Sequence, residues 1–157
     1  MINRTLVALL TVSAVAACSQ QPDSTADQVR TQALGVVAAY NAHDAHKAAS
    51  YDAPDYVGVY HGTPNTIGPA ADEAGMKAQM VAANVDWQLG DGKVTVAKDG
   101  DLGIFEAPYT FVIAIPNAPT TTEHGTWIAI FKRQNDGSMK LWRSIASDTP
   151  APSPSAR

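Results

Sequence analysis

The spacing of apolar residues changes period along this chain, and that change constrains its fold more than any other feature. Up to about residue 84 the pattern is mainly helical, with one apolar stripe running from Val29 to Tyr40. From residue 85 it becomes a series of short strand-like segments separated by turn signals such as Asp136-Gly137. Helices that precede a run of strands predict an α+β domain. We expect a cone-shaped, strongly curved antiparallel sheet with three N-terminal helices over its concave face, which leaves a pocket there.

Capping and turn residues set the expected boundaries of these elements. Ser24 and Asp27 have capping-box-like spacing before the first helix, and Asp44 can cap a second one. Gly90-Asp91-Gly92 predicts either a turn or a kink in one long strand, and Pro108 predicts a bulge or an edge position. The expected helices end near residues 41, 50 and 84, and the expected strands cover residues 56–60, 85–89, 93–97, 102–115, 124–133 and 139–147.

The first eighteen residues carry the three regions of a secretory signal. Arg4 gives a positive start, residues 6–17 are apolar apart from Thr11 and Ser13, and Cys18 follows as the only cysteine. The run is too short to span a bilayer core of about 30 Å as a helix. Small residues before a lone cysteine resemble a bacterial lipobox, which implies cleavage before Cys18 and lipidation of its sulfur.

This resemblance divides the chain and gives it a location. We expect a signal peptide over residues 1–17, a tether over 18–25, one domain over 26–150 and a disordered tail over 151–157. The cysteine is followed by serine rather than aspartate, which favours the outer membrane, with the protein facing the periplasm. Two alternatives remain: an ordinary signal-peptidase site at Ala14-Val15-Ala16, giving a soluble periplasmic protein, and an uncleaved anchor.

Charge and cysteine content exclude several kinds of partner and site. The formal net charge is -4, and removing Arg4 with the leader lowers it by one. Lys132-Arg133 is the densest basic pair, so the chain lacks the clustered cations that nucleic acid binding requires. With Cys18 lipidated, no thiol remains for a disulfide, a zinc-thiolate site or a cysteine nucleophile.

Three motifs resemble those of the nuclear transport factor 2-like superfamily. Residues 38–44 (AAYNAHD) resemble the end of the first helix in those proteins, and residues 51–57 (YDAPDYV) resemble the entry to the first strand. Residues 141–150 (LWRSIASDTP) resemble the final strand of SnoaL-like members. The resemblance covers about residues 27–150 and implies the cone-shaped fold. The superfamily includes isomerases, dehydratases, hydrolases, cyclases and non-enzymatic binding domains, so the resemblance implies no single activity.

The chemistry of one well-understood member type, ketosteroid isomerase, is not matched by this sequence. That enzyme uses an aspartate base, with a tyrosine and a protonated aspartic acid as oxyanion donors. Aligned on residues 41–44, its tyrosine position falls on Val36 and its base position falls on or near Tyr60. Its second aspartate would lie in residues 125–132, which contain no acid. The resemblance therefore does not imply steroid isomerisation by that mechanism.

Three side chains are candidates for acid–base catalysis. His61 follows the first strand, where this fold opens its pocket, and histidine titrates near neutral pH. His124 begins a later strand, and strand alternation places it on the opposite face from Glu123. Glu106 is the only acid inside a long apolar strand, where a buried carboxylate would make a good acid or base. The structural alternatives are a loop position for His61 and a solvated or dimer-interface position for Glu106.

Aromatic residues are the candidate ligand contacts, and their alternative role is core packing. In a cavity they favour an apolar or aromatic small molecule. His43 and His46 have i, i+3 spacing, but no third ligand lies nearby in sequence, so we expect no metal site. We find no G-x-S-x-G motif and no phosphate loop, and we expect no cofactor. The candidate ligand contacts are Tyr60, Trp87, Tyr109 and Trp127.

These observations leave three functions open. The first is a lipid-anchored envelope protein whose pocket binds a small hydrophobic or aromatic molecule. The second is an acid–base enzyme, such as an isomerase, lyase or hydrolase, that uses His61 and His124 at the pocket. The third is a non-catalytic module that forms a homodimer through the outer sheet face, because residues 127–131 carry apolar side chains on both faces. A homodimer is compatible with either of the first two functions.

Overall fold

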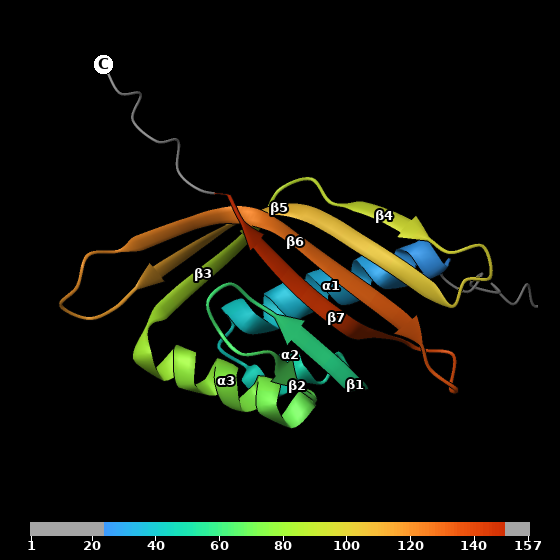
Figure 1. The fold of residues 1–157 in the computed structure, drawn as a ribbon, viewed down its shortest axis with the longest axis horizontal. Coiled ribbons are helices and arrows are strands. Elements are labelled where there is room, and N and C mark those ends of the chain that lie inside the picture. The colour runs from blue at the N-terminus through green and yellow to red at the C-terminus, as the bar shows by residue number, and fades with distance from the viewer. Residues whose placement is uncertain (1–23, 150–157) are drawn as a thin grey trace, which may run out of the picture.

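The computed structural model describes residues 24–149 (Figure 1). The predicted α+β class is confirmed, and the predicted signal peptide, Cys18 and the tail lie outside the described residues. No helix within residues 24–149 is long and apolar enough to cross a membrane. The helices are α1 (Thr25–Asn41), α2 (Ala45–Ala49) and α3 (Pro69–Ala82); the strands are β1 (Asp52–Val59), β2 (Thr66–Ile67), β3 (Asn84–Leu89), β4 (Lys93–Val96), β5 (Leu102–Ala114), β6 (Thr121–Arg133) and β7 (Met139–Asp148).

The strands form one curved sheet in the order β2-β1-β7-β6-β5-β3, with β4 paired to β5 beyond the end of β3. Neighbouring strands are antiparallel, as predicted, except that β1 pairs with β7 in parallel. These two strands come from opposite ends of the domain, so a long connection rather than a hairpin joins them. The three helices lie on the same side of the sheet, as expected (Figure 1).

Helix α1 lies across the inner face of the sheet and supplies much of the core. Ser24 caps it, since its hydroxyl oxygen accepts a hydrogen bond from the Asp27 amide at 3.2 Å. Gly35 leaves room for the Tyr51 side chain, because a Cβ there would lie 2.5 Å from the Tyr51 hydroxyl oxygen and the ring would have to move. The largest fully buried side chains of the described residues are Trp127, Tyr56, Phe105, Phe131, Met139 and Val29.

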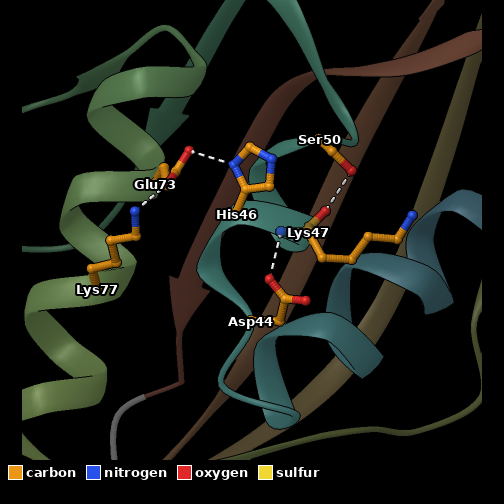
Figure 2. A network of polar contacts seen from close by, with 6 residues as sticks. All are labelled: Asp44, His46, Lys47, Ser50, Glu73 and Lys77. Carbon is orange, nitrogen blue, oxygen red and sulfur yellow. Dashed lines mark hydrogen bonds and ion pairs between the residues drawn. The ribbon is translucent and has the colours of Figure 1, made fainter.

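Helix α3 forms a wall of the domain rather than part of its core, since none of its residues is buried. Polar contacts attach it to α2: the Nδ1 atom of His46 lies 3.1 Å from Oε2 of Glu73, which also pairs with Lys77 (Figure 2). Asp44 caps α2, as predicted, by accepting from the Lys47 amide at 2.8 Å. The partly buried Met76 and Met80 of α3 pack against the cluster of Tyr40, Ala83 and Val85.

Strands β3 and β4 form one continuous stretch of chain along β5, with a kink at residues 90–92. Strand β3 pairs with residues 109–114 of β5, and β4 pairs in the same direction with residues 103–106, so the kink is the correct alternative. Pro108 lies at the break, where its carbonyl accepts from the Gly90 amide at 2.9 Å. The N–H and C=O of one strand residue point to the same side. The N–H that Pro108 lacks would therefore face Gly90, so the proline costs only the second bond of that pair, just beyond the last paired residue of β3.

Candidate functional site

A cavity of about 560 Å³ lies between the inner face of the sheet and helices α1 and α3. Side chains of β1, β3, β5, β6 and β7 form its floor, and the loop that follows β1 contributes His61, Thr63 and Pro64. Pockets for small molecules have volumes of roughly 300 to 1,000 Å³. The pocket expected over the concave face is therefore present, and the protein's own side chains do not fill it.

Four aromatic side chains from four different elements make up one wall of this cavity. The ring of Trp87 (β3) lies 5.6 Å from that of Tyr40 (α1), 6.3 Å from that of Phe111 (β5) and 4.8 Å from that of Trp127 (β6). All three contacts are T-shaped, the arrangement that the quadrupoles of aromatic rings favour. The wall is therefore apolar and fixed by mutual packing.

A chain of hydroxyl groups crosses the cavity from β7 to α3. The Tyr60 hydroxyl lies 3.2 Å from Oγ of Ser144 and 2.7 Å from the Tyr56 hydroxyl. The Tyr56 hydroxyl lies 3.2 Å from Oδ1 of Asp72. The indole N–H of Trp127 donates to Ser144 at 2.9 Å, which ties the aromatic wall to the same chain. The cavity thus combines an apolar wall with one connected polar strip.

Two carboxyl groups end this chain on the side of α3. Asp72 lines the cavity, and its charge acts on the buried carboxyl group of Asp52 (β1), whose Oδ2 atom has no hydrogen-bond partner. Burial, with a smaller contribution from the charge of Asp72, raises the pKa of Asp52 to about 8. Burial raises the pKa of Asp72 to about 6, although hydrogen bonds from Tyr56 and Asp52 act in the opposite direction. At neutral pH the pair therefore shares one proton.

The exposed mouth of the cavity carries a second polar group. The Tyr109 hydroxyl donates to Oδ1 of Asp148 at 2.5 Å, and Nδ1 of His61 lies 3.5 Å from Oδ2 of the same carboxylate. Burial, then the hydrogen bond and charge of Asp148, then the charge of Glu123 raise the pKa of Tyr109. Tyr109 therefore remains a neutral hydrogen-bond donor between two carboxylates.

The predicted site residues divide between the two faces of the sheet. His61, Tyr60, Trp87, Tyr109 and Trp127 all line the cavity. His124 and Glu106 do not, because strand alternation places both on the outer face. There Nδ1 of His124 lies 3.1 Å from the Thr110 hydroxyl, and Glu106 is paired with Ile128. The structure does not bring His61 and His124 into one site.

No metal centre is visible in the part of the chain that the structure describes. Within residues 24–149, no group of three or more His, Cys, Asp or Glu side chains could hold a metal ion. His46 contacts Glu73 across the α2–α3 interface (Figure 2).

Sequence reasoning found Tyr60 but missed the other residues of the polar strip, which are Tyr56, Asp72 and Ser144. Asp72 reads as a first-turn acid that favours the helix dipole. Its spacing to Met76 and Gln79 on one helical face was the available signal that it points into the cavity. No local pattern connects Tyr56 with Asp72 or Tyr60 with Ser144, since these pairs form only when β1, α3 and β7 assemble.

No protein-family model matches the sequence, and no curated protein matches it. Solved structures do match. A candidate dehydratase of the nuclear transport factor 2-like family from Streptomyces avermitilis has a TM-score of 0.69 and 20% identity, over 83% of this chain and 100% of that chain. A ketosteroid isomerase-like protein from Erwinia carotovora atroseptica has a TM-score of 0.68 and 12% identity, over 80% of this chain and 97% of that chain.

A candidate scytalone dehydratase from Novosphingobium aromaticivorans has a TM-score of 0.70 and 10% identity, over 83% of this chain and 88% of that chain. At identities this low the likeness concerns the fold and not the activity. Together with the element order and the cavity, these matches show that the chain has the fold of the nuclear transport factor 2-like superfamily, as the sequence motifs implied.

Proposed function

We propose that this protein binds a small hydrophobic or aromatic molecule in its cavity. The observation that carries the proposal is an open volume of about 560 Å³ with one aromatic wall and one polar strip. Burial of a ligand's apolar surface against Trp87 and Phe111 supplies affinity, at roughly 25 cal/mol per Å². The hydroxyl of Tyr60, between Tyr56 and Ser144, is placed to orient a polar group of the ligand.

We place this activity at the bacterial cell envelope, on the outer membrane facing the periplasm. The support is the apolar leader that ends in small residues before Cys18, the only cysteine in the chain. Two or more acyl chains on that residue give stable anchoring, because each buried methylene contributes about 0.8 kcal/mol. Ser24, the first described residue, caps α1, so only a short segment separates the anchor from the domain.

Native mass spectrometry of the full protein extracted from its own membranes tests the binding proposal. We expect a discrete mass increment above that of the lipidated chain, and its size defines the ligand class. A variant that fills the cavity provides the control. Gly75 lies on the same face of α3 as Asp72 and Gln79, and a Cβ there meets no atom within 4 Å. Gly75→Phe should keep the fold and lose the increment, whereas Gly75→Ala should keep both.

A second candidate function is acid–base catalysis on the bound molecule. Its specific support is the position of Asp72, a carboxyl group with a pKa of about 6 that lines the cavity and shares a proton with Asp52. A base with a pKa near the working pH is effective in proton transfer. In this version His61 at the mouth contributes without His124, which lies on the outer face.

Once the ligand is known, turnover at saturating substrate distinguishes catalysis from binding. Asp72→Asn should lower kcat by about 100-fold or more if Asp72 transfers the proton. His61→Ala measures how much the imidazole at the cavity mouth contributes to turnover. An unchanged ligand recovered after prolonged incubation with the wild-type protein would exclude the enzymatic version and leave the binding function intact.

A further inference from the structure

We propose that the cavity selects a ligand with a positively charged nitrogen, an organic ammonium group, over neutral or anionic molecules of the same shape. The juxtaposition that points to this is an aromatic wall enclosed by the carboxylates of Asp72, Glu123 and Asp148. The inference rests on the proposed binding function and names the chemical class of its ligand.

The carboxylates are the dominant charged groups in the lining of the cavity. Three carboxyl groups take part in the lining, and no described lining residue is lysine or arginine. His61 is the only basic side chain among them, and it lies beside the Asp148 carboxylate. An anionic ligand would therefore be desolvated without a counter-charge, which is costly in a partly buried site.

Nearby lysines are engaged outside the cavity. Lys77 on α3 pairs with Glu73, and Lys140 on β7 donates to the backbone carbonyl of Ser50 at 2.5 Å. Neither belongs to the lining. The negative potential of the cavity is thus not cancelled by a cation that reaches into it.

The aromatic wall adds a second attraction for a cation. Aromatic ring faces attract ammonium groups within about 6 Å, and quaternary ammonium ligands are bound in this way by groups of aromatic side chains. Tyr40, Trp87 and Phe111 come from three elements and hold one another in place at 5.6 to 6.3 Å. An ammonium group in this space would meet rings on one side and the Asp72 carboxylate on the other.

The carboxylates act at two depths. Asp72 is half-buried, lines the interior of the cavity and accepts a hydrogen bond from the Tyr56 hydroxyl at 3.2 Å. Glu123 and Asp148 are exposed at the mouth, where their charges attract a cation before it enters. The aromatic wall and the carboxylates at the mouth therefore both favour a positively charged ligand.

Three aromatic probes that differ in charge test the inference on the full-length protein at pH 7.5. They are benzyltrimethylammonium, its uncharged carbon isostere neopentylbenzene, and phenylacetate. Equilibrium dialysis should give a Kd for the ammonium probe about tenfold below that of the neutral isostere, with phenylacetate weakest. Gly75→Phe should abolish binding of the ammonium probe, which locates it in the cavity.

Matched charge variants identify the side chains responsible. Asp72→Asn should reduce the preference for the ammonium probe over the neutral one severalfold, and the pair Glu123→Gln and Asp148→Asn should slow its association. Asp86→Asn also removes one negative charge, but this side chain contacts Gln88 outside the cavity, and the preference should not change. If Asp72→Asn does not fold, the three probes on the wild-type protein and the variants Glu123→Gln and Asp148→Asn still test the preference for a positive charge.

Each outcome bears on the inference separately from the proposed function. Equal binding of the ammonium and neutral probes, or tighter binding of phenylacetate, would overturn the charge preference and leave a small-molecule pocket in place. Failure of all three probes to bind would also overturn it. Joined to a ligand-free native mass spectrum, that failure would count against the binding function as well.

Discussion

The hydroxyl oxygens of Tyr56 and Tyr60 lie 2.7 Å apart, and each has a second polar partner, Asp72 for Tyr56 and Ser144 for Tyr60. The Tyr56 hydroxyl donates to the Asp72 carboxylate, and the Tyr60 hydroxyl donates to Oγ of Ser144. The contact between the two tyrosines therefore lies at the centre of one continuous polar strip from α3 to β7.

The strip should behave as one cooperative unit in unfolding experiments. Tyr60→Phe and Ser144→Ala should each lower the free energy of unfolding by about 1 to 2 kcal/mol, because each leaves a buried polar partner unsatisfied. The double variant should cost less than the sum by at least about 0.5 kcal/mol, since both changes break the same contact. Urea denaturation of the four proteins measures this cycle, and strictly additive values would show that the two side chains are not coupled.

The buried carboxyl pair should make stability fall as pH rises. The folded pKa values of Asp52 (about 8) and Asp72 (about 6) lie above the ordinary aspartate value of about 3.9. Between the unfolded and the folded pKa values, the folded state binds more protons than the unfolded state. The stabilisation from the two carboxyl groups is therefore fully present below about pH 4 and is lost as the pH rises through 6 to 8. Asp52→Asn keeps a donor to Asp72 without the titration. Its thermal midpoint should therefore vary less than that of wild type from pH 5 to 9. Asp86→Asn should leave the profile unchanged, and a variant Asp52→Asn with the wild-type slope would contradict the assignment.

Two glycines should respond oppositely to the same substitution. A Cβ at Gly125 would lie 2.3 Å from the Ser147 carbonyl oxygen and 2.7 Å from the Tyr109 ring. Gly125→Ala should therefore destabilise the domain by about 1 to 3 kcal/mol. Gly75→Ala meets no atom within 4 Å and gains helix propensity, so it should stabilise by up to about 1 kcal/mol. Thermal melts of both variants check the pair, and similar shifts would show that packing around Gly125 is not tight.

The outer sheet face supports a homodimer, which we propose as the assembly of this protein. Ile104 pairs with Ile130, and Ile128 pairs with Ile145, so four isoleucines form an apolar patch on the face opposite the helices. Sedimentation equilibrium should give a dimer that Ile130→Asp converts to a monomer. Ile115→Asp, at a position 49% exposed beyond the end of β5, is the control and should leave the dimer intact. A wild-type monomer at high concentration would refute the proposal.

Lipidation of Cys18 should determine where the protein resides. Cys18→Ser removes the sulfur that we propose carries the lipid, so the variant should be lost from the lipidated form in the membrane fraction. It should appear either in the soluble fraction or as the uncleaved precursor. Mass spectrometry should show acyl chains on the wild-type N-terminus and none on the variant. A wild-type protein cleaved after Ala16 and free of lipid would establish the ordinary signal-peptidase alternative.

Sequence periodicity predicted the fold well because each element carries its own signal. The stripe from Val29 to Tyr40 is buried in α1, and alternation assigned His124 and Glu123 to opposite faces of β6, where the structure has them. The pairing of β1 with β7 in parallel was not predicted, since no local feature of either strand specifies a partner so distant in sequence.

The site was predicted in part, and the division has a physical cause. Large aromatic residues such as Trp87 and Trp127 are conspicuous in any sequence, and both line the cavity. Asp72 is an ordinary residue in the first turn of a helix, and its role depends on Tyr56 and Asp52, which only tertiary structure brings near it. Residues defined by their neighbours rather than their type remain invisible until the neighbours are known.

Because β7 lies between β1 and β6, the sheet can be completed only when this last strand is available. A chain that emerges N-terminus first presents β1 without its principal partner until residues 139–148 have followed. Tyr60 likewise waits for Ser144, so the floor of the cavity is assembled last. Such distant pairing slows folding. The cavity is therefore complete only after nearly the whole domain has been released, and a chain truncated before β7 lacks the strand that supplies Leu141, Ser144 and Asp148 to the lining.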